Sequence, residues 1–85
     1  MYEILWKPKA RKQLNRINSQ HDREAVYDAV GSLADWPVHQ NVKRLMNHKY
    51  GYRLRVGRYR VLFDVHGLIR IVEIQEVKKR DEHTY

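Results

Sequence analysis

Residues 50–65 of the 85-residue chain read YGYRLRVGRYRVLFDV, and their side chains alternate between apolar and charged types. A period of two residues is typical of β-strands, because successive side chains point to opposite faces of a sheet. Leu54 and Val56 share one face, and the alternation resumes after Gly57, which permits a tight turn or a bulge. The stretch therefore predicts two strands joined around Gly57, with one apolar face and one charged face.

The charged face of these two strands is dominated by arginine. Four arginines fall within eight residues: Arg53, Arg55, Arg58 and Arg60. A guanidinium group is a planar fork that suits phosphate oxygens, and it also stacks on nucleobases. Like charges this close repel one another, so we expect solvent or a polyanion to offset them. The alternative is a solvated sheet face with scattered ion pairs, such as Arg60 with Asp64 or Glu73.

The rest of the chain predicts a single domain over residues 1–85. Pro8 suits the first turn of a helix, and Ala10, Leu14 and Ile17 form its apolar stripe. The expected elements, in order, are a strand (2–6), the helix from Pro8, a second helix (22–36), a loop (37–51) with room for a short strand around 42–46, the two strands above, a last strand (68–77) and a charged, irregular tail (78–85). This order, β-α-α-β-β-β, predicts an α+β fold in which a helical hairpin covers one face of a mostly antiparallel sheet.

Charge and composition narrow the possible partners. The chain has 17 lysines and arginines against 10 acidic residues, a net charge of +7, which favours nucleic acid or an acidic protein. It has no cysteine, which excludes disulfides, thiolate zinc sites and thiol nucleophiles. The histidines outside the tail lack the spacing of metal ligands: His21, His39, His48 and His66. Because of this spacing and the lack of cysteine, we expect no metal, and we expect no other cofactor. No apolar run approaches the ~20 residues of a membrane span, so we expect a cytoplasmic protein.

Two stretches together carry a family resemblance. YRLRVGRYRVLFDV, followed by IVEIQEVKKRDEHTY, resembles the RelE/ParE superfamily of small bacterial toxins from type II toxin–antitoxin systems, and the upstream NVKRL is also similar. The resemblance covers nearly the whole chain and implies one toxin domain with a RelE-like, microbial-ribonuclease type of fold. RelE-like members cleave mRNA in the ribosomal A site and so inhibit translation, whereas ParE-like members poison DNA gyrase. A cognate antitoxin with an acidic or partly disordered segment is the implied partner.

The RelE branch of the resemblance implies a set of catalytic residues. Carried over by position, they are Arg53, Arg55, Arg60, Arg80, His83 and Tyr85. The sequence departs from the best-known pattern, because arginines replace lysines on the first strand and the spacing from Arg80 to Tyr85 is shorter. Arginine stabilises charge but stays protonated, so it cannot act as a base. His83 is then the natural proton carrier, while Tyr85 is a candidate acid or a stacking platform for a base.

Further basic residues are candidates for contacts with RNA, either the message or ribosomal RNA. They are Lys9, Arg11, Lys12, Arg16, Lys49, Arg58 and Lys79. The preferred interpretation is a metal-independent endoribonuclease, or mRNA interferase, in which a 2′-hydroxyl attacks the adjacent phosphate. Two alternatives stay open: a ParE-like gyrase inhibitor, and an inactive relative that binds only nucleic acid or an antitoxin.

Overall fold

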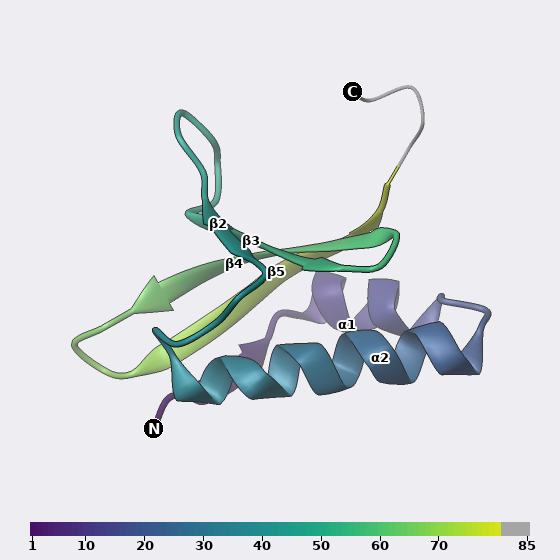
Figure 1. The fold of residues 1–85 in the computed structure, drawn as a ribbon, viewed down its shortest axis with the longest axis horizontal. Helices are drawn as coiled ribbons and strands as arrows, with labels where there is room; N and C mark the ends of the chain where they lie inside the picture. Colours follow the sequence, from purple (N-terminus) through teal and green to yellow (C-terminus); the bar gives the residue numbers. More distant parts are fainter. Residues whose placement is uncertain (81–85) are drawn as a thin grey trace.

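The computed structural model of the protein describes residues 1–80 (Figure 1). Its elements, in chain order, are β1 (Glu3–Trp6), α1 (Pro8–Asn15), α2 (Gln20–Gly31), the 3₁₀ helix η1 (Ser32–Asp35), β2 (Val42–Arg44), β3 (Tyr52–Val56), β4 (Tyr59–His66) and β5 (Ile71–Lys79). The expected α+β fold is confirmed, with the short strand β2 added to the predicted order. None of these described helices is long and apolar enough to cross a membrane.

The five strands form one mixed sheet in the order β1-β5-β4-β3-β2. The neighbours from β5 to β2 are antiparallel, whereas β1 runs parallel to β5, with Glu3 opposite Ile71 and Trp6 opposite Ile74. Both helices lie on one side of this sheet, and the loop between β2 and β3 rises from the other side (Figure 1). The sheet therefore has one covered face and one face that is open to partners.

The helices form where the sequence provides start signals and apolar stripes. Pro8 opens α1, which buries Ala10 and Leu14. The Oγ atom of Ser19 accepts a hydrogen bond from the backbone N–H of Asp22 at 3.2 Å, so it caps the N-terminus of α2. The helix predicted over 22–36 thus begins two residues earlier and gives way to η1 after Gly31.

The core lies between the helices and the covered face of the sheet. Its largest fully buried side chains are Phe63, Leu33, Leu54, Ile74, Val26, Val30, Val61 and Val72. Trp36 closes one end, since its ring packs edge-on against Tyr52 at 4.8 Å and against Phe63 at 5.7 Å between centroids. The apolar alternation in β3 and β4 therefore points into the core, as the sequence predicts.

The predicted limits of the last strand are wrong. Residues 67–70 form a turn between β4 and β5, and Leu68 and Ile69 are exposed there. Arg70 has a φ angle of 53°, in the left-handed region, which ends the turn just before Ile71. The strand instead continues to Lys79, so two residues that were assigned to an irregular tail belong to the sheet.

A β-bulge changes which side chains of β5 face outward. Leu62 lies opposite Glu76 but Phe63 lies opposite Ile74, so Gln75 is the extra residue on β5. Its side-chain amide donates hydrogen bonds to Asp64 at 3.1 Å and to Glu73 at 2.6 Å. After the bulge the alternation is shifted by one residue, which turns Glu76 and Lys78 toward the open face.

Candidate functional site

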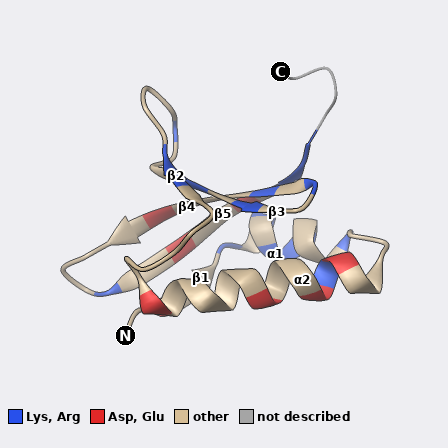
Figure 2. Cartoon of the chain, in the orientation of Figure 1, with Lys and Arg blue, Asp and Glu red and all other residues tan. Residues whose placement is uncertain are grey.

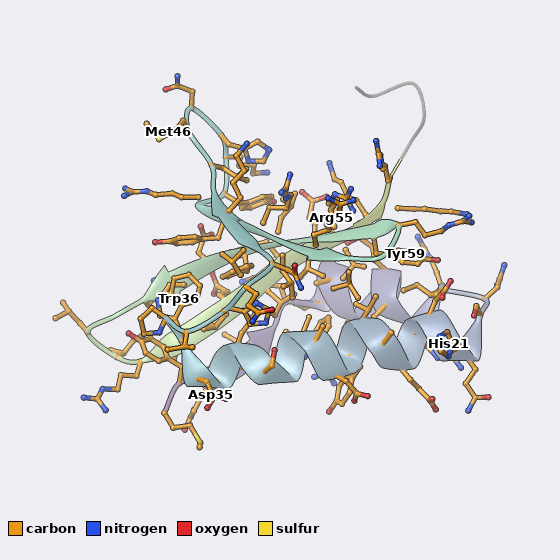
Figure 3. The ribbon with its side chains drawn as sticks, in the orientation of Figure 1. His21, Asp35, Trp36, Met46, Arg55 and Tyr59 are labelled. Carbon is orange, nitrogen blue, oxygen red and sulfur yellow. The ribbon has the colours of Figure 1, made fainter. Side chains whose placement is uncertain are left out.

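The strand register gathers cationic side chains on the open face. Arg55 of β3 lies directly opposite Arg60 of β4, and Arg60 lies opposite Lys78 of β5. Residues directly opposite one another in an antiparallel pair share a face with Cβ atoms roughly 5 Å apart. Arg53 lies two residues before Arg55 and so projects from the same face. Figure 2 shows basic residues along β2, β3 and the end of β5, and Figure 3 shows Arg55 on the side away from the helices.

Arg60 is buried, with only 8% of its surface exposed. One of its terminal guanidinium nitrogens donates hydrogen bonds to the carbonyl oxygens of Gly57 at 3.1 Å and of Tyr59 at 2.9 Å. Gly57 has a φ of 55° in the tight turn between β3 and β4, a conformation that glycine adopts readily. The turn therefore positions a carbonyl that orients the guanidinium group.

Arg53 has a buried polar atom that is not satisfied by protein. Its Nε atom is buried and has no hydrogen-bond partner among the described residues. A buried donor without a partner costs roughly 1–3 kcal/mol, so such atoms in native proteins usually need a functional explanation. An anion that accepts a hydrogen bond from Arg53 would relieve this cost.

Both arginines line a pocket of about 700 Å³ on the open face, which we call the arginine pocket. Its lining residues are Gln13, Leu45, His48, Arg53, Arg60, Leu62, Val77, Lys78, Lys79 and Arg80. The backbone N–H of Arg80 donates a hydrogen bond to the carbonyl of Arg58 at 2.6 Å, which holds the segment after β5 against the β3–β4 turn. The pocket is thus built from α1, the loop before β3, three strands and the residue that follows β5.

The loop of residues 45–51 forms one wall of the arginine pocket. The N–H of Leu45 donates to the carbonyl of Gly51 at 2.8 Å, which ties the two ends of the loop together. The N–H of Gly51 in turn donates to Asp64 Oδ1 at 2.8 Å, and a Cβ atom at Gly51 would lie 3.3 Å from that oxygen. The close approach of this backbone to β4 therefore favours glycine and fixes the base of the loop.

Glu76 is a buried carboxylate that connects α1, the loop and β5. It pairs with the Nζ atoms of Lys9 at 3.2 Å and Lys78 at 3.9 Å. Burial raises the pKa of Glu76, but hydrogen bonds from Lys9 and the Tyr50 hydroxyl, together with the charges of Lys78 and Lys9, outweigh it and leave the pKa below its usual value. Glu76 is therefore ionised at neutral pH and offsets part of the positive charge around the pocket.

The structure brings together some of the residues singled out from the sequence and separates others. Arg53, Arg60, Lys79 and Arg80 line the arginine pocket, and Arg55 is exposed beside Arg60 on the same face. Lys49 lies in the loop with its Nζ atom 5.4 Å from the centre of the Tyr50 ring, and Arg58 occupies the β3–β4 turn.

The remaining candidates lie elsewhere. Arg11 and Lys12 are exposed on α1, Lys9 pairs with Glu76, and Arg16 lines a separate pocket of about 400 Å³ beside Tyr59. His83 and Tyr85 lie outside the described residues. Within residues 1–80, no group of three histidine, aspartate or glutamate side chains is placed to hold a metal ion.

Several pocket residues were not selected from the sequence. Lys78 faces the pocket because of the β5 bulge, and the spacing of Val72, Ile74 and Val77 is a sequence signal for that bulge. Gln13 reaches the pocket because its Oε1 atom accepts a hydrogen bond from the N–H of Val77 at 2.7 Å. No local sequence pattern predicts the contact between Gln13 and Val77 or the position of His48 at the arginine pocket. The described site is thus a preformed cationic pocket suited to an anion such as a phosphodiester.

Solved structures support the fold assignment. The isolated E. coli RelE toxin is similar with a TM-score of 0.81 and 16% identity, over 99% of this chain and 89% of that one. The RelE–RelB complex of Pyrococcus horikoshii OT3 gives 0.80 and 22%, over 95% and 97% of the two chains. The toxin–antitoxin complex RelBE2 of Mycobacterium tuberculosis gives 0.78 and 24%, over 93% and 98%. At these identities the likeness shows a shared RelE-like fold.

Sequence comparison identifies the family. None of the curated proteins matches the chain. The family model described as the ParE toxin of the type II toxin–antitoxin system parDE matches residues 4–83, which is almost the whole chain. This chain therefore belongs to the ParE toxin family of type II toxin–antitoxin systems, within the RelE/ParE superfamily.

Proposed function

We propose that this toxin cleaves mRNA in the ribosomal A site and so inhibits translation. The observation that carries the proposal is the buried Nε of Arg53, which has no partner within residues 1–80 and belongs to a pocket that also holds Arg60, Lys78 and Arg80. Such a pocket gathers several cations at one place, an arrangement that stabilises developing negative charge.

The proposed chemistry needs no metal. The 2′-hydroxyl of one nucleotide attacks the adjacent phosphorus, the bond to the 5′-oxygen of the next nucleotide breaks, and a 2′,3′-cyclic phosphate forms. The proton of the 2′-hydroxyl passes to a base, and the leaving 5′-oxygen takes a proton from an acid. Arg53, Arg55, Arg60 and Arg80 are proposed to stabilise the extra charge of the transition state, while His83 and Tyr85 remain the proposed proton carriers.

Contacts with ribosomal RNA are proposed for the exposed cations around the pocket. Arg11, Lys12 and Arg16 of α1, together with Lys49, Arg58 and Lys79, are the candidates. Lys9 is better explained as the ion-pair partner of Glu76, although 63% of its side chain remains exposed. Since messages and ribosomes occur in the cytoplasm, the proposal places the toxin there.

A cognate antitoxin is the proposed protein partner. Four of the similar structures are complexes of a toxin with its antitoxin. With a net charge of +7 on this chain, an acidic segment that folds on binding would be attracted to the open face and cover the arginine pocket. Neutralisation would then follow from competition for the same cations.

Gyrase inhibition is the second candidate, because the family model that matches the chain is that of the ParE toxin. The two activities can be separated in one set of reactions. Purified toxin would be added to ribosomes programmed with a defined mRNA, and in parallel to DNA gyrase with relaxed plasmid. Cleavage mapped to the A site by primer extension supports the proposal; loss of supercoiling without cleavage would refute it and favour the second candidate.

The pocket itself is tested with matched variants. Arg53→Ala should lower the cleavage rate at least tenfold, because it removes a charged donor from the phosphate site. Arg70→Asn is the control, since it also removes one positive charge but lies in the β4–β5 turn, where its φ of 53° is tolerated by asparagine. Equal cleavage by Arg53→Ala and Arg70→Asn would exclude the arginine pocket as the reactive site.

A further inference from the structure

His48 lies in the loop of residues 45–51 and lines the arginine pocket together with Arg53 and Arg60. Its Nδ1 atom accepts a hydrogen bond from the backbone N–H of Tyr50 at 3.0 Å. No other described residue forms a hydrogen bond or ion pair with the ring, whose centroid lies 6.0 Å from that of Tyr50. The loop therefore forms a hydrogen bond with Nδ1, and Nε2 is available to bind a ligand.

The hydrogen bond from Tyr50 decides which nitrogen carries the proton. A backbone N–H can only donate, so Nδ1 must present its lone pair, and the neutral ring then carries its proton on Nε2. In this tautomer Nε2 is a hydrogen-bond donor and has no lone pair with which to accept a proton. His48 is thus arranged to bind an acceptor in the pocket, and it is not arranged to act as a base there.

The loop that carries His48 is fixed to the sheet at a second point. The hydroxyl of Tyr50 donates a hydrogen bond to Glu76, which is itself held by Lys9 at 3.2 Å. The residue that sets the tautomer of His48 is therefore anchored to β5 and, through Lys9, to α1. This anchoring keeps the imidazole at the wall of the pocket before any ligand binds.

We propose that His48 is an anion-binding residue of the arginine pocket, which donates a neutral Nε2–H hydrogen bond to a phosphate oxygen, with Tyr50 and Glu76 as its positioning residues. A neutral donor adds a hydrogen bond to the anion without adding another positive charge beside Arg53, Arg60 and Lys78. Its effect on RNA cleavage rests on the proposed function, whereas its binding of phosphate does not.

Two substitutions of His48 separate its two nitrogens. In His48→Asn, the side-chain oxygen lies close to the former position of Nδ1 and can still accept from the N–H two residues on, as in an Asx turn, but the Nε2 donor is lost. In His48→Gln, the side-chain amide can place an N–H near the former position of Nε2, while the contact with Tyr50 is lost. The first variant keeps the loop and removes the donor, and the second does the reverse.

The first test measures the tautomer and phosphate binding in the wild-type protein. Nitrogen NMR of the imidazole should show the proton on Nε2, and titration with inorganic phosphate should shift the His48 signals. The shift should disappear in Arg53→Ala and persist in the control Arg70→Asn. A proton on Nδ1, or a phosphate titration that leaves His48 unchanged, would overturn the proposal whether or not the protein cleaves RNA.

The second test measures cleavage of programmed ribosomes by the same variants. His48→Asn should lower kcat/KM about tenfold, as expected for one lost hydrogen bond, and His48→Gln should remain within about threefold of wild type. Tyr50→Phe, which removes only the hydroxyl that binds Glu76, should have an intermediate effect. Wild-type rates in His48→Asn would overturn the role in cleavage. If wild type binds phosphate through His48 but cleaves no RNA, the proposed function fails and the anion site stands.

Discussion

Arg60→Ala is expected to lower the stability of the fold as well as the activity. The substitution removes at least two hydrogen bonds, which a buried guanidinium group donates to the carbonyls of Gly57 and Tyr59. Hydrogen bonds from charged donors contribute about 1.5 kcal/mol each at the lower end of their range, which gives a loss of about 3 kcal/mol. Because Arg55 is exposed, removing its repulsion with Arg60 returns at most about 1 kcal/mol, the upper end for exposed charge pairs.

The net expectation is a loss of about 2 kcal/mol in the free energy of unfolding. For a domain of this size that corresponds to a fall of about 8–16 °C in Tm. Urea unfolding followed by tryptophan fluorescence measures it, because Trp36 packs against the core residue Phe63. Arg55→Ala is the matched control: it removes the same repulsion, but from an exposed side chain, and should leave stability unchanged or raise the free energy of unfolding by up to about 1 kcal/mol.

Equal unfolding midpoints for the two variants would refute this reasoning. They would mean that the carbonyl contacts of Arg60 contribute nothing net to stability. If the difference is found, loss of toxicity in Arg60→Ala does not by itself identify a catalytic role. Activity must then be compared at a temperature where both variants are fully folded.

Three further outcomes follow from contacts around the pocket. Gln13→Leu leaves the N–H of Val77 without its acceptor and should cost about 1–3 kcal/mol in urea unfolding, while Gln13→Glu, which keeps an oxygen there, should cost much less. Glu76→Gln should be less stable than wild type at pH 7. Because folding lowers the pKa of Glu76 from its ordinary value of 4.5, this difference should be fully present above that value and shrink as the pH falls through the lowered pKa in acid titrations of stability; a constant difference would contradict the ion-pair assignment. Gly57→Val should lower Tm more than Gly57→Asn, since asparagine tolerates the φ of 55° better.

Local patterns were enough to predict β3 and β4, two of the three strands that build the site. Leu54, Val61 and Phe63 are buried and Arg53 and Arg55 face outward, because a period of two specifies the face of a strand regardless of its partner. The helical period likewise predicted that Ala10 and Leu14 are buried on α1, whereas Ile17, assigned to the same stripe, is buried just beyond the end of that helix.

The start of the last strand was predicted from apolar character alone and was placed three residues too early, at residue 68 instead of Ile71. Leu68 and Ile69 resemble strand residues but occupy an exposed turn, because the positive φ of Arg70 and the hairpin geometry decide where pairing begins. The parallel pairing of β1 with β5 was not predicted either, since it joins segments from opposite ends of the described chain.

The pocket depends on contacts between distant segments, which explains why its wall was not predicted. His48 reaches the arginines only because Gly51 is bound to Asp64 and Tyr50 to Glu76, and each contact joins the loop to a strand that comes later in the sequence. No spacing within residues 45–51 reports these partners. The charges of the pocket were therefore predictable, but its shape was not.

The position of β5 also governs when the fold can form. β5 is the last strand in chain order, yet it lies inside the sheet, between β1 and β4. β1 pairs with no other strand of the sheet, so a growing chain holds its first strand unpaired until β5 has been made. Joining segments so far apart in sequence costs loop-closure entropy before any contact repays it, which slows folding and makes it cooperative. Lys78 also lies on β5, so the complete arginine pocket arises only late in synthesis, once this inner strand is in place.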